Sequence, residues 1–160
     1  ILGYLLGFFI AVFLIFIPLN IAIFFVTKAS GFGLFIWSLS LLFELIILIT
    51  FSLLSSLILK NSFSAIFASF GFYLISRMMG VFVLAINLPD NVNQAKNHFL
   101  EFILKIISIA FPRLDIFAQS SWLHYGFKDY DLLKIIIWQS AIYIPLMVFM
   151  AFHDFKKKQF

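Results

Sequence analysis

Long apolar runs are the feature that most constrains what this chain can fold into. A helix needs about 20 apolar residues to cross a bilayer core of roughly 30 Å. Four stretches of the sequence meet that length: residues 1–26, 34–59, 62–88 and 131–153. Open strands cannot satisfy their backbone hydrogen bonds in lipid. The runs therefore predict an all-α membrane protein, a polytopic helical bundle with about four transmembrane helices in one domain.

The composition supports this class. Charged residues make up 11% of the chain, whereas a soluble domain carries about 25%. So few charges cannot cover the surface of a water-soluble globule, and we expect lipid to surround most of the protein. The net charge is +4, but the basic residues are scattered, which does not fit nucleic-acid binding. Cysteine is absent, which excludes disulfides, thiolate metal sites and cysteine nucleophiles within this sequence.

The two ends of the sequence differ in character. The chain starts at Ile1 and enters an apolar run at once, without the basic region that opens a signal peptide. We therefore expect a preceding part of the protein that this sequence does not contain. The densest basic cluster is FKKKQF at 155–160, which the positive-inside rule places in the cytoplasm. Counting back through the predicted helices places 89–130 outside and Lys60 inside.

The connection at 89–130 holds most of the polar residues. Within it, 97–111 is strongly apolar, but a helix of this length reaches only about 22 Å and is too short to span. Pro112 ends that helix, and 115–123 is predicted as a second short helix with Asp115 as its N-cap. The sequence therefore predicts a short external re-entrant helical hairpin.

Two charged residues lie deep inside predicted crossing helices. Glu44 is fifteen residues from Leu59, at the end of its helix. Arg77 is fifteen residues from Ser62, at the start of the next helix. In a tight antiparallel hairpin both would lie about 22 Å from the same membrane face. Because pairing lowers the cost of a charge in lipid, we predict an ion pair that either locks the hairpin or lines a substrate path.

Enzymatic signatures are weak. The three histidines are isolated and form no H-E-x-x-H pattern. Asp115, Ser120, Ser121 and His124 lie close in sequence, but no G-x-S-x-G nucleophile motif surrounds them. No phosphate-binding glycine loop is present, so we predict that this chain is not an enzyme and does not hydrolyse ATP by itself.

Four stretches of the sequence point to one family of membrane proteins. They are LGYLLGFFIAVFLIF (2–16), SLLSSLILKNSFSAIFASF (52–70), FPRLDIFAQSSWLHYG (111–126) and FHDFKKKQF (152–160). Together they resemble the permease subunits of ABC-2-type ABC transporters, over nearly the whole chain. The resemblance corresponds to the C-terminal four-helix part of that family's six-helix transmembrane domain.

This resemblance implies a function. The chain would be the membrane-spanning permease subunit of an ATP-driven exporter in the bacterial inner membrane, with a cytoplasmic C-terminus. A partner ATP-binding cassette ATPase would hold ATP and Mg²⁺, so this chain would need no cofactor. A second permease subunit, identical or different, would complete the pathway within the lipid bilayer. The stretch 111–126 would supply an external gate, whose candidate residues are Pro112, Asp115, Phe117, Trp122 and Tyr125.

The sequence also fits two alternative functions. The chain resembles, in composition and helix number, a helical membrane subunit of a respiratory or other multi-subunit complex, where Glu44 and Arg77 would belong to a proton relay. An intramembrane enzyme or scaffold of unknown type is the third alternative, and an activity assay after replacing Asp115, Ser120 and His124 would bear on it.

Overall fold

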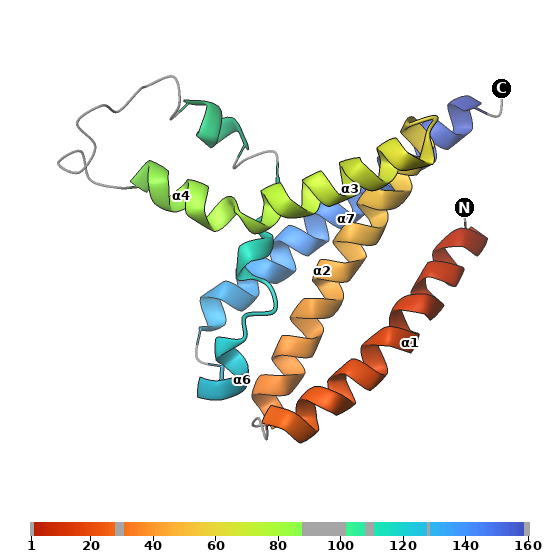
Figure 1. Ribbon diagram of the computed structural model, residues 1–160. Helices are drawn as coiled ribbons and strands as arrows, with labels where there is room; N and C mark the ends of the chain where they lie inside the picture. The colour runs from red at the N-terminus through yellow and green to blue at the C-terminus, as the bar shows by residue number, and fades with distance from the viewer. Residues whose placement is uncertain (1, 28–30, 88–101, 108–110, 128, 159–160) are drawn as a thin grey trace.

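The fold is built from long helices. The computed structural model describes residues 2–27, 31–87, 102–107, 111–127 and 129–158, and these residues are mostly helical and form no strand (Figure 1). The main helices are α1 (Leu2–Thr27), α2 (Gly31–Ile58), α3 (Ser62–Arg77), α4 (Met79–Asn87) and α7 (Tyr130–Lys158). A 3-10 turn, η1 (Leu114–Ile116), and a short helix, α6 (Ser121–Tyr125), precede α7. The predicted all-α class is therefore confirmed.

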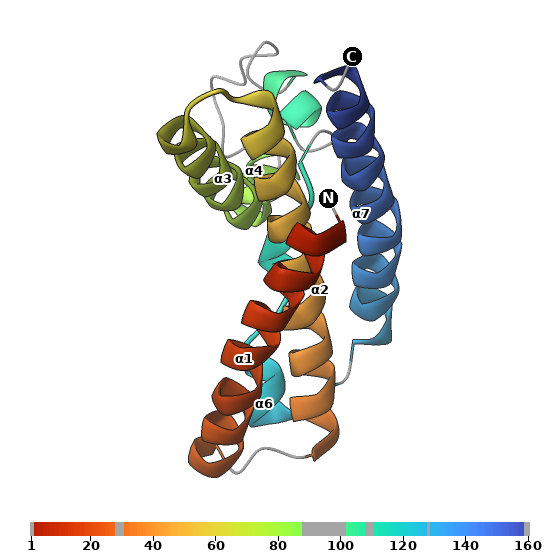
Figure 2. The same cartoon turned by 90° about the vertical axis from the view of Figure 1, so that its right-hand side faces the viewer.

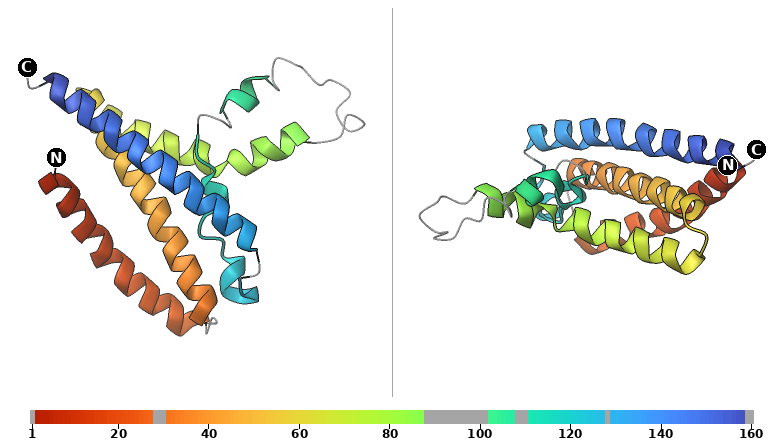
Figure 3. Two further views of the ribbon diagram at one scale, coloured as in Figure 1. Left: turned by 180° about the vertical axis from the view of Figure 1, so that it is seen from behind. Right: turned by 90° about the horizontal axis from the view of Figure 1, so that it is seen from above.

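Helices α2 and α7 form the centre of the fold. They run side by side in the same direction, and α2 lies between α7 and α3 (Figures 2 and 3). The hydroxyl of Thr50 on α2 lies 3.7 Å from the sulfur of Met147 on α7. By length and composition, Gly31–Ile58 and Tyr130–Lys156 are the two segments found able to cross a membrane among the described residues. The predicted second and fourth crossing helices correspond to these two.

Helix α1 is attached to the bundle by few contacts. Asn20 and Ser38 form a hydrogen bond between α1 and α2, and the Asn20 amide also donates to the carbonyl of Phe16 at 2.9 Å. Most other described side chains of α1 are exposed, including Phe25, of which 73% is exposed. The helix contains the first predicted apolar run and continues through Pro18. Within α1, Val12–Thr27 is an apolar helical stretch shorter than a full span.

The predicted third helix, 62–88, is not continuous. Helix α3 ends where Met78 (φ −82°, ψ −2°) donates its N–H to the carbonyl of Leu74, and α4 begins at the next residue. The pieces contain 16 and 9 residues, about 24 and 14 Å. Neither piece alone reaches the roughly 30 Å of a bilayer core. The sequence prediction of a single crossing helix here was therefore wrong about its continuity.

The α2–α3 connection is as short as predicted, but the two helices do not stay together. Asn61 caps α3 by accepting a hydrogen bond from the N–H of Phe63 at 3.1 Å, which is a frequent N-cap arrangement. Beyond this turn the helices diverge, and η1 and the residues around it lie between them (Figure 1). The hairpin is thus open at its far end rather than tight.

The predicted helix 115–123 is also wrong. The chain instead forms η1, extends at Phe117 and enters α6 only at Ser121. Asp115 does not cap a helix of its own, because Arg113 pairs with its carboxylate at 3.0 Å. Gly126 follows the end of α6 and has a φ of 73°. Of the predicted apolar helix 97–111, residues 97–101 and 108–110 lie outside the described residues, while 102–107 are helical.

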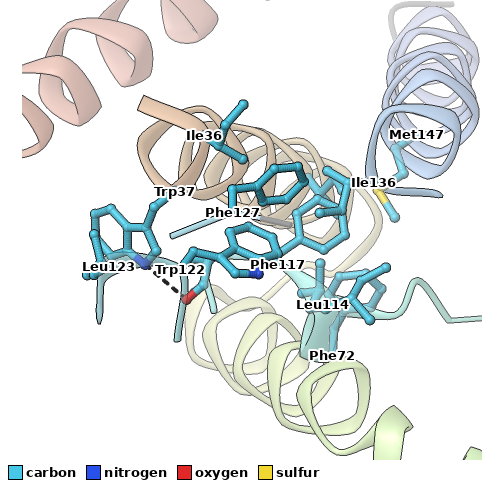
Figure 4. Close-up of a cluster of buried hydrophobic side chains, with 13 residues drawn as sticks. Ile36, Trp37, Phe72, Leu114, Phe117, Trp122, Leu123, Phe127, Ile136 and Met147 are labelled. Carbon is cyan, nitrogen blue, oxygen red and sulfur yellow. Dashed lines mark hydrogen bonds between the residues drawn. The ribbon is translucent and has the colours of Figure 1, made fainter. Parts of the chain in front are cut away.

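The main apolar core surrounds this irregular segment. Figure 4 shows side chains from α2, α3, α7 and the segment 111–127 pointing toward one another. Phe117 and Leu114 are completely buried. The other buried members include Ile36, Trp37, Ile47, Phe72, Ile116, Trp122, Leu123, Phe127, Ile136 and Met147. A segment predicted to be external thus fills the space between three long helices.

Candidate functional site

The candidate site lies near the middle of α2, at the level where α3 ends. We call it the central junction, and it consists of Glu44, Arg77 and residues 112–118. Glu44 lies thirteen residues from Gly31 in a helix of 28 residues, about 20 Å along its roughly 42 Å length. Figure 1 shows the chain of 112–118 crossing between α2 and the α3–α4 break at this level. Charges and irregular backbone therefore coincide in one place.

Arg77 connects the three parts of the junction. Its Nη1 atom donates to Glu44 Oε1 at 3.2 Å, which forms the ion pair that the sequence predicts. The same atom lies 2.8 Å from the carbonyl oxygen of Leu114 and 3.3 Å from that of Phe117. The Glu44 side chain is 6% exposed and that of Arg77 is 39% exposed. The carboxylate thus lies inside the protein, and the guanidinium lies at its edge.

Two side chains of α2 bind the backbone of Ala118. Its N–H donates to Ser40 Oγ at 3.0 Å, and its carbonyl accepts from the indole Nε1 of Trp37 at 3.1 Å (Figure 4, dashed line). Ala118 has a φ of 44°, the left-handed region that alanine rarely adopts. Buried backbone groups need partners, so these contacts stabilise a conformation that is unfavourable locally.

Asp115 lies against the first turn of α4. A Cβ atom added to Gly80 would meet its Oδ2 atom at 2.5 Å and its Cβ atom at 3.3 Å, so the glycine leaves the space that the carboxyl group occupies. Arg113 Nη2 pairs with the same carboxylate. A negative charge beside a helix N-terminus is favourable because the helix dipole is positive there. This contact accounts for part of the break between α3 and α4.

The predicted gate residues have different environments. Pro112, Phe117 and Trp122 are buried, Asp115 is partly exposed, and 81% of Tyr125 is exposed. The first four therefore belong to the packed interior or its edge, and Tyr125 lies on the surface.

The residues considered for catalysis are not brought together. Ser120, Ser121 and His124 are exposed, and the carboxylate of Asp115 is ion-paired with Arg113. Among the described residues, no group of three or more His, Asp or Glu side chains is arranged to hold a metal ion. The junction therefore offers charge and hydrogen-bond donors rather than a nucleophile.

Sequence reasoning missed Trp37, Ser40 and Ala118. Trp37 and Ser40 are three residues apart and so share one face of α2, which would have indicated a common partner. No local pattern indicated that this partner would be a backbone some 80 residues away. Next to Arg77 on α3, the hydroxyl of Ser76 is buried without a hydrogen-bond partner among the described residues, and the same holds for the hydroxyl of Ser140 on α7.

Comparisons with protein-family models, with curated proteins and with solved structures find no match to this chain. The class that the fold itself defines is an all-α protein whose described residues include two helices long and apolar enough to cross a membrane.

Proposed function

We propose that this chain is the membrane-spanning permease subunit of an ATP-driven exporter of the ABC-2 type. It forms the translocation pathway together with a second permease subunit. A separate ATP-binding cassette ATPase binds ATP and Mg²⁺ and supplies the energy. The resemblance of the four sequence stretches supports this family, and the central junction supports a role in a pathway.

The observation that carries the proposal is the irregular segment 112–118 packed beside the middle of α2. Non-helical backbone at membrane depth is tolerated where protein or a water-filled cavity surrounds it. Transporters use such interruptions, because broken helices expose backbone groups near the bilayer centre where substrates bind. Here Arg77 and Glu44 bring charge to the same level, and Arg77 is 39% exposed. A partly exposed charge at that depth is expected to face a polar cavity or another subunit.

The positions of the basic residues indicate which end of the bundle faces the cytoplasm. Lys60 follows the end of α2, and Lys156 lies near the end of α7. Because α2 and α7 run in the same direction, both lysines lie toward the same end of the bundle (Figure 1). The positive-inside rule assigns this end to the cytoplasm of a bacterial inner membrane. The opposite end, with Gly31 and Tyr125, then faces outward.

One observation favours a second function. Glu44 is an almost completely buried carboxylate, and Ser76 and Ser140 are buried hydroxyls that have no hydrogen-bond partner within the described part of the chain. Buried carboxylates and hydroxyls are the groups that proton relays use in membrane complexes. A helical subunit of a respiratory or other multi-subunit complex is therefore the alternative function.

Copurification distinguishes the two functions. The full-length protein is tagged, extracted from its own membrane in a mild detergent, and its stoichiometric partners are identified by mass spectrometry. The proposal predicts an ATP-binding cassette ATPase in the complex, in a nucleotide-sensitive amount. Redox subunits carrying haem, flavin or iron–sulfur clusters, without such an ATPase, would instead establish the alternative.

A further inference from the structure

A groove runs along the outer face of the C-terminal half of α7. Its volume is about 560 Å³, and because all of its described lining residues belong to α7, it is an open depression on one helix face rather than an enclosed cavity. Its described lining residues are Pro145, Val148, Phe149, Phe152, His153 and Lys156. Neither the central junction nor the predicted gate contributes to this groove.

The lining residues form one stripe. They follow one another at spacings of one and three residues, which places most of them on a single helix face. From Pro145 to Lys156 the helix rises by about 16 Å, close to the roughly 15 Å of one leaflet of the bilayer core. The groove thus has the length of one leaflet along a helix that is able to cross the membrane.

The groove is apolar along its length and basic at one end. Phe149 and Phe152 are 74% and 57% exposed, so they offer apolar surface that nothing in the described chain covers. His153 and Lys156 lie at the end expected to face the cytoplasm. The nearest acid on this helix, Asp154, points to the opposite side, because successive residues are rotated by about 100°. An amphiphile with an anionic head matches this distribution.

We propose that this groove binds an anionic phospholipid. One acyl chain lies along Pro145–Phe152, and the headgroup phosphate lies near Lys156 and His153. Basic residues at the cytoplasmic end of membrane helices attract anionic headgroups, and the apolar stripe adds a contact that a soluble phosphate lacks. The inference requires α7 to cross the membrane, but it does not depend on the transported substrate or on the ATPase partner.

Lipid-dependent stability tests the proposal. The thermal unfolding midpoint of the full-length protein, with any copurifying subunits, is measured in detergent while phosphatidylglycerol or phosphatidylcholine is added. Phosphatidylglycerol is expected to raise the midpoint at lower concentration. Lys156→Gln should weaken the phosphatidylglycerol effect by about fivefold, the contribution of one lysine near an anionic surface. Lys60→Gln removes the same charge at the same end but outside the groove, and it should leave the effect unchanged.

A second pair of variants tests the acyl-chain contact. Phe149→Ser should weaken the response to phosphatidylglycerol, whereas Phe67→Ser, on α3 and similarly exposed at 71%, should not. Equal responses to the two lipids would overturn the assignment of an anionic headgroup. Equal losses in Lys156→Gln and Lys60→Gln would overturn the proposal in favour of diffuse electrostatic attraction. If inorganic phosphate alone reproduced the shift, the groove would be a phosphate site and the lipid assignment would be wrong.

Discussion

The guanidinium of Arg77 and the carboxylate of Glu44 form an ion pair at 3.2 Å across 33 residues of sequence. The same guanidinium nitrogen binds two carbonyl oxygens of the segment between α4 and α7, those of Leu114 and Phe117. One side chain therefore holds α2, the end of α3 and an irregular segment together. This arrangement makes the central junction a structural link between these three elements and the centre of the proposed pathway.

Removing the Arg77 charge should destabilise the protein strongly. Arg77→Gln leaves the buried Glu44 carboxylate without its partner, and breaking a buried pair typically costs about 3–5 kcal/mol. Because 39% of Arg77 is exposed, the low end of this range, about 3 kcal/mol, is expected. The free energy of unfolding in detergent measures the effect. Glu44→Gln should cost less, because the amide oxygen still accepts the hydrogen bond.

A surface ion pair provides the control for this change. Lys134 and Asp131 pair at 2.9 Å, but their side chains are 77% and 91% exposed. Exposed pairs contribute about 0–1 kcal/mol, so Lys134→Gln should leave stability nearly unchanged. Equal losses in Arg77→Gln and Lys134→Gln would contradict the structural role assigned to Arg77.

The Ser40 hydroxyl should contribute measurably to stability. Ser40→Ala leaves the buried N–H of Ala118 without an acceptor, and an unsatisfied buried donor costs about 1–3 kcal/mol. Ser56→Ala is the matched control on the same helix, because that hydroxyl is exposed and bonds only to the carbonyl of Leu53 within α2. Chemical unfolding of both variants should separate them by at least about 1 kcal/mol. Identical midpoints would show that the Ser40 contact is unimportant.

Ala118 should tolerate glycine better than a larger residue. Its φ of 44° costs an L-residue about 1–2 kcal/mol, a cost that glycine avoids. Ala118→Gly loses one buried methyl group, worth about 0.8 kcal/mol, and should therefore stay within about 1 kcal/mol of the unmodified protein. Ala118→Val adds a branched side chain in the same strained conformation and should lose about 2 kcal/mol or more. The reverse order of stabilities would contradict the left-handed geometry.

The contact between Gly80 and Asp115 predicts an unusual cost for a small substitution. Gly80→Ala would place a methyl group 2.5 Å from the carboxylate oxygen, so Asp115 must move, at a cost of about 1–3 kcal/mol. Gly71→Ala, on α3 with no atom within 4 Å of the added Cβ, should be neutral or stabilising by up to about 1 kcal/mol. Thermal unfolding of the two variants gives the comparison. A destabilised Gly71→Ala beside an unaffected Gly80→Ala would refute the packing described for α4.

The sequence predicts the long helices well because apolar length and turn residues are local properties. It also predicts the Glu44–Arg77 pair, since helix geometry fixes the depth of each charge. The break at Met78 has no glycine or proline at the capping position itself, and it depends on Asp115, Leu114 and Phe117, which are distant in sequence.

The conformation of segment 111–127 also depends on residues that are distant in sequence. Asp115 suits an N-cap by residue type, but Arg113 and the first turn of α4 are its actual partners. Ala118 suits a helix by propensity, yet the side chains of Ser40 and Trp37 hold it in a left-handed conformation. Tertiary contacts override local preference in both cases.

The most direct test of the proposed function is ATP hydrolysis by the complex that copurifies with this chain in proteoliposomes. The account predicts ATPase activity that falls several-fold in Arg77→Gln, while Lys134→Gln keeps the activity of the unmodified complex. The amount of assembled complex is measured in parallel, so that lost assembly is not mistaken for lost activity. A fully assembled complex without ATPase activity, or one whose activity is the same with Arg77→Gln, would contradict the assignment of the central junction to an ATP-driven pathway.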